Sequence, residues 1–257
     1  MPSFSPDFQP LQEQIARLSP DRYDDIVFRH PMSFYRDRVE MAGAQNFHKA
    51  LDAGHGFGQW SIALAERNGH VTGVDHNKPR CEISLMLKEH FGIANLDVAV
   101  APLSTLDQMF TPKSFDYIWC WGVIMFVDRA RVMRIFNNLL VEGGVLFLGS
   151  VNTPERWAYK IGLARSQGTG NDNFFRTCEK GVNGLFNETG VNAFSRDKDV
   201  SQRIVDPYGF NILDIDYDGR IDKVAKRVLP FEQIANIRDE NVEMILEKRT
   251  DVELLVS

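Results

Sequence analysis

The stretch LDAGHGFGQW, residues 51–60, decides the fold of this 257-residue chain. Apolar residues lead into an acid, three glycines follow at alternate positions, and a helix is expected over 59–66. A strand, a loop and a helix in this order place the loop at the carboxyl end of a strand, where ligands bind in open α/β sheets. Gly54, Gly56 and Gly58 remove side chains that would keep a ligand off the backbone, and the helix start adds free N–H groups.

A second strand, HVTGVD at 70–75, ends in another acid. The carboxylate of Asp75 can accept hydrogen bonds from both ribose hydroxyls of an adenosine, so the combination predicts an adenosine-containing ligand. A purely structural glycine turn stays open as the alternative. The nicotinamide-dehydrogenase fingerprint would have its third glycine at position 59, which is Gln, and no phosphate-binding Gly-Lys-Ser/Thr motif is present.

Strands alternate with helices through the middle of the chain, which predicts right-handed βαβ units and a doubly wound sheet. The expected strands are 49–52, 70–75, 96–101, 115–121 and 144–151. The expected helices are 59–66, one capped by Asn77, and 128–140. A further helix is expected after Ser195, and the segments 211–217 and 252–256 are interpreted as a strand pair that closes the sheet edge.

Five segments resemble motifs of the class I S-adenosylmethionine-dependent methyltransferases of the small-molecule type. They are LDAGHGFG (51–58), VTGVDHN (71–77), SFDYIWCWGVIMFVD (114–128), LLVEGGVLFLGSVN (139–152) and DPYGFNILDIDYDG (206–219). The resemblance implies an α/β, Rossmann-like, doubly wound sheet of seven strands with the last strand antiparallel. We expect a single domain, 1–257, with an N-terminal helical cover (1–46), a cofactor-binding core (47–151), an insertion that covers the substrate (152–194), and a C-terminal helix and strand pair (195–257).

The same resemblance implies a set of cofactor contacts. Asp52 and Gly54 would lie under the methionine part, Gly56 and Gly58 against the nucleoside, and Asp75 at the ribose. Cys120 and Trp121 would lie beside the sulfonium. The predicted set is completed by His76, Leu103 and Arg38.

Two of these assignments concern positions where the pattern departs from the family or admits another interpretation. Relatives often have an acid after the third strand that meets the adenine amino group, whereas this chain has Ala101-Pro102-Leu103. Adenine would then be held by backbone groups and apolar contact. Tyr35, Arg36 and Arg38 could clamp the cofactor carboxylate, as basic residues do in some relatives; the alternative is a solvated helix face with Asp37 and Glu40 as partners.

Methyl transfer is an in-line displacement for which the protein supplies alignment and a dry site. A base is needed only if the acceptor must lose a proton early. His55, in the glycine loop, and His30, before the first strand, are the candidate bases, although a side chain at position 55 could simply point to solvent. His48 is a further candidate for the mouth of the site. No His/Asp/Glu spacing suggests a metal site.

The segment 152–193 begins where the fifth strand delivers the chain to the mouth of the site. Its aromatic and basic residues favour a substrate cover, with a static helical insertion as the alternative. The candidate substrate-binding residues are Trp157, Tyr159, Phe175 and Arg176.

The composition narrows the choice of partners. The net charge is -6 and the pI about 5.6, so nucleic acid and membrane are not expected as partners. The Asn/Asp-Pro-Pro-Tyr/Phe motif of DNA amino-methyltransferases is absent, three scattered cysteines are interpreted as reduced thiols, and neither a secretory signal nor a membrane-length apolar run is present. We therefore expect a cytoplasmic protein.

These observations favour an enzyme that transfers a methyl group from S-adenosylmethionine to an oxygen or nitrogen of a small-molecule acceptor. A natural-product scaffold, a sugar and a cell-envelope precursor all stay open. The alternatives are a non-catalytic protein that binds S-adenosylmethionine and a nicotinamide-dependent oxidoreductase.

Overall fold

The computed structural model describes residues 4–19, 27–152, 197–217, 219–224 and 241–250, together with Phe194 and isolated positions between 161 and 179. Three of the expectations above therefore lie outside the described residues: the strand at 252–256, Trp157 and Tyr159.

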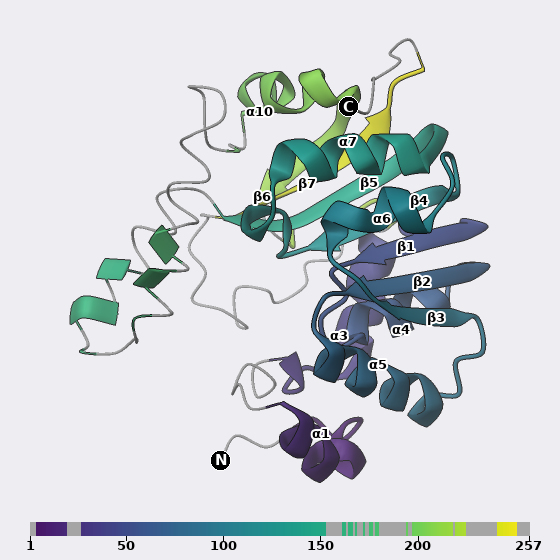
Figure 1. Ribbon diagram of the computed structural model, residues 1–257, viewed down its shortest axis with the longest axis vertical. Helices are drawn as coiled ribbons and strands as arrows, with labels where there is room; N and C mark the ends of the chain where they lie inside the picture. The colour runs from purple at the N-terminus through teal and green to yellow at the C-terminus, as the bar shows by residue number, and fades with distance from the viewer. Residues whose placement is uncertain are drawn as a thin grey trace.

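The framework is one sheet of seven strands in the order β3-β2-β1-β4-β5-β7-β6 (Figure 1). Strands β1 to β5 pair in parallel, whereas β7 is antiparallel to both of its neighbours. The predicted Rossmann-like sheet with an antiparallel last strand is confirmed. The strands are β1 (Lys49–Ala53), β2 (His70–Asp75), β3 (Leu96–Val100), β4 (Phe115–Trp121), β5 (Leu140–Asn152), β6 (Phe210–Tyr217) and β7 (Asn241–Lys248).

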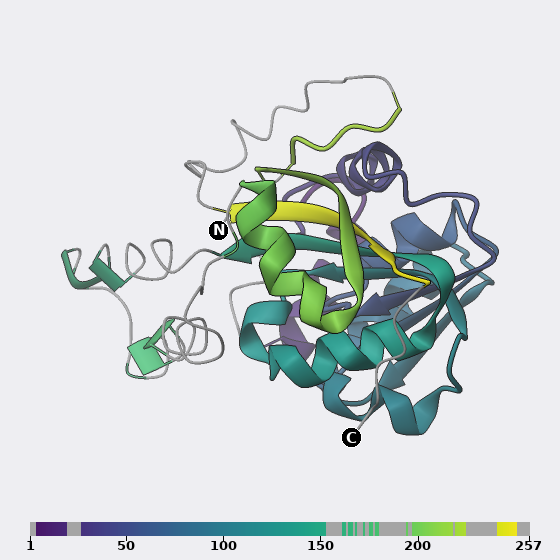
Figure 2. The ribbon, with the colours of Figure 1, turned by 90° about the horizontal axis from the view of Figure 1, so that it is seen from above.

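Helices cover both faces of this sheet. In Figure 1, α7 lies in front of β5 and β7, α10 lies at the top beside β6, and α3 and α4 lie behind the other strands. The view from above in Figure 2 shows α10 running along β6. The α-helices are α1 (Gln12–Leu18), α3 (Met32–Met41), α4 (Gln59–Ala65), α5 (Lys78–His90), α6 (Leu106–Met109), α7 (Arg129–Leu139) and α10 (Lys198–Val205). The short 3-10 helices are η1 (Gln9–Leu11), η2 (Leu103–Thr105), η3 (Ile124–Phe126) and η4 (Asp206–Tyr208).

Local capping fixes where the flanking helices begin. The side chain of Asn77 accepts a hydrogen bond from the backbone of Arg80 at the start of α5, as the sequence predicts. Asp128 and Asp197 cap α7 and α10 in the same way. Each cap satisfies backbone N–H groups that a helix start otherwise leaves without partners.

The sheet is buried on both faces because its central strands are apolar throughout. In β4, Tyr117 and Trp119 belong to the apolar cluster beneath α3, α4 and α5, while Ile118 and Cys120 belong to the cluster beneath α7 and α10. This alternation follows from the two-residue period of a strand. Trp121 continues the first set at the carboxyl end of β4, so it lies on the same face as α4.

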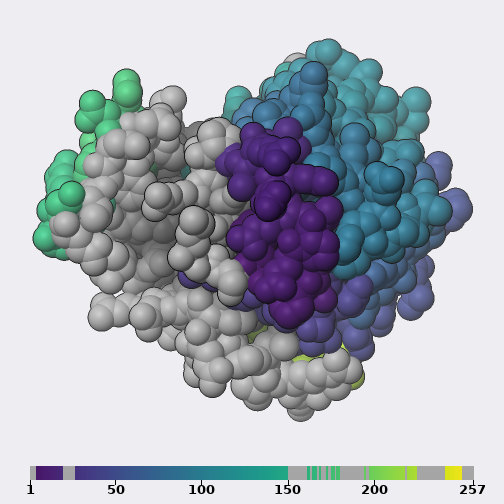
Figure 3. All heavy atoms as spheres, turned by 90° about the horizontal axis from the view of Figure 1, so that it is seen from below, coloured from purple at the N-terminus to yellow at the C-terminus, as the bar shows by residue number. Residues whose placement is uncertain are grey.

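The N-terminal segment packs on the α4/α5 side through aromatic rings. The Phe28 ring lies 5.3 Å from that of Phe57 in the glycine loop, and the Phe8 ring lies 5.8 Å from that of Phe91 after α5. In Figure 3 the purple N-terminal atoms lie directly against the blue atoms of this side. The predicted N-terminal cover thus reaches the loop that follows β1.

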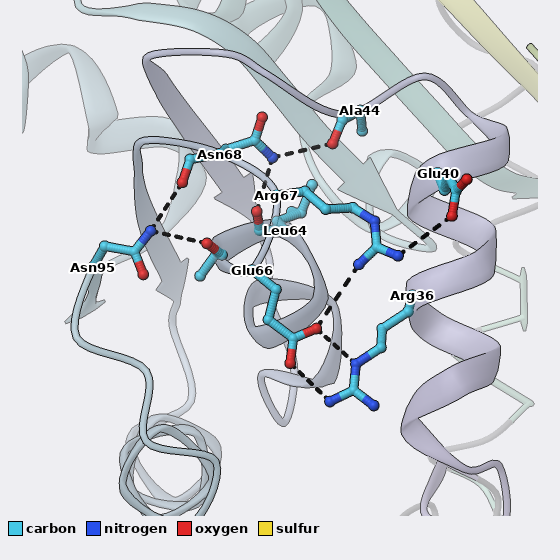
Figure 4. A network of polar contacts seen from close by, with 9 residues as sticks. Arg36, Glu40, Ala44, Leu64, Glu66, Arg67, Asn68 and Asn95 are labelled. Carbon is cyan, nitrogen blue, oxygen red and sulfur yellow. Dashed lines mark hydrogen bonds and ion pairs between the residues drawn. The ribbon is translucent and has the colours of Figure 1, made fainter. Parts of the chain in front are cut away.

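Helix α3 runs parallel to α4. Tyr35, in the first turn of α3, contacts the Trp60 ring near the start of α4 at 4.7 Å. In the middle of α3, Arg36 pairs with Glu66 just after α4, and near the end of α3, Glu40 pairs with Arg67 (Figure 4). The start of α3 therefore lies at the same edge of the sheet as the start of α4, which is the edge where the parallel strands end.

The structure differs from the strand predictions in two places. The described partner of β6 is β7 at 241–248, a strand that the sequence analysis did not predict. Strand β5 begins at Leu140 rather than 144, because the residues before the paired glycines extend the strand. Among the described residues, no helix has the length and apolar character to cross a bilayer.

Candidate functional site

The glycine loop after β1 is fastened to the end of β2 by backbone hydrogen bonds. The N–H groups of Gly54 and His55 donate to the carbonyl oxygen of Val74, at 2.7 and 3.2 Å. One residue later, the N–H of Gly56 donates to the Asp75 carboxylate at 3.0 Å. The loop and the acid that the sequence singled out are therefore parts of one rigid unit at the carboxyl edge.

The Asp75 carboxylate accepts two hydrogen bonds from the backbone and has lone pairs for further donors. Its Oδ2 accepts from Gly56, its Oδ1 accepts from the N–H of Asn77 at 2.8 Å, and its side chain is only 5% exposed. A carboxylate has about four lone-pair positions, so each oxygen can accept one more hydrogen bond. His76 lies beside it, with Nδ1 at 3.4 Å from Oδ1, and is exposed. This arrangement fits the two adjacent hydroxyls of a ribose.

The three loop glycines have different surroundings. A Cβ on Gly56 would meet no atom within 4 Å, so open space lies over this residue, and its φ of +58° disfavours any side chain. A Cβ on Gly54 would lie 2.5 Å from a methyl of Val123, in the loop after β4. A Cβ on Gly58 would lie 2.1 Å from the Ser84 hydroxyl of α5. Gly58 is thus required for packing of the loop against α5, and a ligand contact there stays a prediction.

Asp52 is buried beneath the loop. Its Oδ2 accepts a hydrogen bond of 2.6 Å from the Ser61 hydroxyl of α4. Burial raises the pKa of Asp52 to about 7, despite the opposing effect of the Ser61 hydrogen bond. A positively charged ligand group nearby would favour the ionised carboxylate. Ser61 did not emerge from the sequence, although its place one turn into α4 points it back towards the end of β1.

His55 does not point where the sequence suggested. Its side chain is 1% exposed and lies beneath the loop, with Nε2 3.4 Å from the Cys81 thiol of α5. The ring is therefore enclosed by the protein. Burial lowers the pKa of His55 to about 4, so the ring is neutral near pH 7. The structure favours a packing role because the ring fills the space beside Gly73.

Arg38 is also placed differently from the prediction. It is fully buried and its guanidinium pairs with the Glu243 carboxylate of β7, while Nη1 donates to the carbonyl of Ile221 at 2.8 Å. Arg36 makes two hydrogen bonds to Glu66, at 2.6 and 2.7 Å, and the Tyr35 hydroxyl donates to a backbone carbonyl. None of the three is free to clamp a cofactor carboxylate. For Arg38 the alternative of a solvated face with Asp37 and Glu40 as partners is also wrong, because its side chain is fully buried against Glu243.

The residues at the end of β4 divide between the two faces of the sheet. Cys120 is buried in the apolar cluster under α7, and burial raises the pKa of its thiol. Trp121 is half-buried on the opposite face, where it can meet a ligand at the carboxyl edge. Leu103 is buried in the same cluster as Cys120, so contact with adenine would have to come from its backbone.

The remaining predicted site residues lie in different parts of the molecule. His30 is half-buried just before α3, with its ring 4.7 Å from that of Phe34. His48 is exposed at the amino end of β1, which places it at the opposite edge. Phe175 and Arg176 are described only as isolated positions; the Arg165 guanidinium lies over the Phe175 ring, and Arg176 is exposed. Within the described part of the chain, no cluster of His, Cys, Asp or Glu could hold a metal ion.

Comparisons with known proteins agree with this geometry. A family model for a methyltransferase domain matches residues 46–182. A ubiquinone biosynthesis O-methyltransferase from Pseudomonas aeruginosa is 28% identical over 127 residues, which cover 49% of this chain and 52% of that protein. The chain thus spans about half the length of the curated relatives it matches.

Solved structures share the fold at low identity. An S-adenosylmethionine-dependent methyltransferase from Clostridium acetobutylicum superposes with a TM-score of 0.57 at 14% identity, over 93% of this chain and 99% of that one. A magnesium protoporphyrin IX methyltransferase from Synechocystis, with bound S-adenosylhomocysteine, gives a TM-score of 0.55 at 14% identity, over 94% and 99%. At this identity the likeness establishes the fold alone.

Proposed function

The chain belongs to the methyltransferase domain family, and we propose that it transfers the methyl group of S-adenosylmethionine to an oxygen of a small-molecule acceptor. The observation that carries the proposal is the Asp75 carboxylate, fixed by two backbone N–H groups and adjoining the open space over Gly56. The name of the ubiquinone biosynthesis relatives supports oxygen rather than nitrogen as the acceptor atom.

The described residues suit each part of this cofactor. Asp75 would accept hydrogen bonds from the ribose hydroxyls, and Gly56 would let the nucleoside approach the backbone. Asp52, whose pKa of about 7 leaves it poised between its two forms, would meet the positive end of the methionine part. When bound, the cofactor supplies a methyl group attached to a positively charged sulfur.

The protein then has to align an acceptor and receive its proton. The cofactor would supply its methyl group to the acceptor oxygen, and a side chain of the protein, acting as a base, would have to take up the hydroxyl proton. We assign that base to His30, because it lies at the start of α3 on the carboxyl edge, whereas His55 is enclosed. Burial lowers the pKa of His30, and the charge of Arg29 adds to this effect, so the imidazole is neutral and able to accept a proton at pH 7.

The segment 152–194 lies mainly outside the described residues. We propose from its sequence that it covers the acceptor and that Trp157, Tyr159, Phe175 and Arg176 contribute to the substrate site. The division of the chain at 46, 151 and 194 is likewise a proposal, as are a location in the cytoplasm and the absence of nucleic-acid partners.

The first experiment separates the proposal from its two alternatives. Calorimetry with S-adenosylmethionine and with NAD distinguishes the transferase from an oxidoreductase. A screen of hydroxylated small molecules for release of S-adenosylhomocysteine then distinguishes an enzyme from a protein that only binds the cofactor. Tight binding of NAD without S-adenosylmethionine, or cofactor binding without turnover of any acceptor, would contradict the proposed function.

A second experiment tests the base. His30→Gln should lower kcat by about 100-fold with little change in cofactor affinity, because a positioned base contributes about that much. In the wild type, kcat should fall only at a pH below about 6.5, since the pKa is lowered, and this acid limb should be lost in the variant. His48→Gln, at the opposite edge, is the matched control and should leave kcat unchanged. Equal activity of the two variants would remove His30 from the mechanism.

A further inference from the structure

We propose that the acceptor is a planar aromatic compound with a phenolic hydroxyl, and that its ring stacks against Trp121. This inference rests on the proposed function and specifies its substrate class. It is carried by the way in which Trp121 is held at the carboxyl end of β4.

Strand β5 has a glycine at the position that packs against the Trp121 side chain. Trp121 is the cross-strand neighbour of Gly149. A Cβ on Gly149 would lie only 2.4 Å from Cε3 of the indole, so any residue other than glycine would displace the ring. The N–H of Gly122 also donates to the carbonyl of Gly149 at 2.9 Å, which fixes the chain on both sides of the indole's attachment.

Buried rings support the indole from within the molecule. The Trp60 ring centroid lies 4.9 Å from that of Trp121, and Trp119 and Phe147 lie 6.3 and 6.4 Å away with planes tilted by only 9°. Trp119, Phe147 and Trp60 are buried, whereas Trp121 is half-buried. These buried rings fix the orientation of the Trp121 indole, and part of its surface stays exposed to solvent.

That surface lies where an acceptor must come. Strand β4 is next to β1, with Trp119 in register with Asp52, so Trp121 is two residues further towards the carboxyl edge. A Cβ on Gly122 would meet no atom within 4 Å, as for Gly56 in the neighbouring loop. Open space therefore adjoins both loops beside the indole.

The proposed base belongs to the same aromatic system. The Trp60 ring is 6.2 Å from that of Phe34, which in turn is 4.7 Å from the His30 ring. Phe34 and His30 are both half-buried. The half-exposed rings Trp121, Phe34 and His30 thus extend from β4 to the start of α3 around the buried Trp60.

Two chemical arguments select an aromatic acceptor. Aromatic faces attract other aromatic rings in stacked or tilted geometry beyond what burial alone provides, whereas a saturated ring is puckered and gains only burial. A phenolic hydroxyl also has a pKa near 10, like that of tyrosine. The pKa of the His30 imidazole is lowered, which makes it a weak base. A weak base deprotonates a phenol far more readily than it deprotonates an aliphatic alcohol.

The test compares matched ligands. Phenols of one to three fused rings, each paired with its fully saturated alcohol, are titrated into the protein saturated with S-adenosylhomocysteine, and binding is followed by ligand-observed NMR. At least one phenol should bind about five- to tenfold more tightly than its saturated counterpart. Trp121→Leu should abolish this preference, Trp121→Phe should retain most of it, and Gly149→Ala should weaken it by displacing the indole.

The control is Phe126→Leu, which removes a 55% exposed ring from the same loop and should leave the preference unchanged. Equal binding of phenols and saturated alcohols, no binding of either set, or a preference that survives Trp121→Leu would overturn the proposal. So would a Trp121→Leu variant that loses affinity only for S-adenosylmethionine, because the indole would then serve the sulfonium alone. In all these cases normal binding of S-adenosylhomocysteine would leave the transferase proposal standing.

Discussion

Two carboxylates of the sheet, Asp75 in β2 and Glu243 in β7, are both buried but have different surroundings. Asp75 accepts two backbone hydrogen bonds at the end of β2, one of them from Gly56, over which a Cβ would meet no atom within 4 Å. Glu243, in β7, pairs with the Arg38 guanidinium, and its other oxygen accepts from the N–H of Ile221 at 2.6 Å. Each carboxylate accepts two hydrogen bonds from the chain, but Glu243 has the fully buried Arg38 as a counter-ion, whereas the basic side chain beside Asp75 is the exposed His76.

This difference separates a ligand site from a structural clamp. The Arg38–Glu243 pair fastens α3 to β7 and to the segment after β6, where the N–H of Lys223 also donates to the carbonyl of Met41 at 2.7 Å. It holds the helix whose first turn contacts Trp60. A buried carboxylate therefore indicates a structural role when a buried counter-ion from the same chain neutralises it, as Arg38 neutralises Glu243.

The largest expected effect is on stability at the clamp. Glu243→Gln should lower the free energy of unfolding by about 3–5 kcal/mol, because it leaves the Arg38 charge buried without a counter-ion. Urea unfolding followed by circular dichroism measures this loss. The double variant Arg38→Met/Glu243→Leu should recover much of it, since two apolar side chains replace the pair. A loss below about 1 kcal/mol would mean that water reaches the pair, contrary to its burial.

The next effect is a pH dependence at Asp52. The pKa of about 7 is raised above its ordinary value, so the folded protein binds a proton that the unfolded chain releases. The resulting stability is fully present below about pH 4 and is lost as the pH rises towards 7. Asp52→Asn removes this dependence. Between about pH 5 and 7, the variant should therefore gain about 2 kcal/mol relative to the wild type in the absence of cofactor.

Chemical unfolding of both proteins at these two pH values measures the gain. A constant difference between them would show that Asp52 is ionised throughout, and the argument for a cationic group of the ligand beside it would lose its basis.

The smallest effect is expected at the surface network of Figure 4. Arg36 makes a two-pronged contact with Glu66, but both side chains are partly exposed. Arg36→Gln should cost less than about 1 kcal/mol, and the cost should shrink further in high salt. Thermal unfolding at low and high ionic strength checks this. A loss as large as that of Glu243→Gln would erase the distinction between buried and exposed pairs.

The sequence predicted those parts of the molecule that depend on local pattern. The bounds of β2 and β4, the Asn77 cap of α5 and the helix after Ser195 all agree with expectation, since periodicity and capping act over a few residues. The glycine loop and Asp75 were found together because strand, loop and strand follow one another directly. Here 19 positions separate the two partners of the hydrogen bond from Gly56 to Asp75.

What the sequence could not predict depends on distant partners and on side-chain direction. Nothing near Arg38 in the sequence points to Glu243, and the strand at 241–248 was not predicted. His55 was expected to face the acceptor or the solvent, yet its ring fills the space beside Gly73. The packing of Trp121 against Gly149 could not be predicted without knowing the register of β4 against β5.

The most direct test of the account is calorimetric titration of S-adenosylhomocysteine into the wild type, Asp75→Ala and Glu243→Gln, each under conditions where it is folded. Loss of a charge-assisted hydrogen bond costs about 1.5–3 kcal/mol, so Asp75→Ala should bind at least about tenfold more weakly while retaining its fold. Glu243→Gln should bind within about twofold of the wild type, because its effect is confined to stability. Unchanged affinity in Asp75→Ala, or a loss confined to Glu243→Gln, would contradict the assignment of the cofactor to the glycine loop.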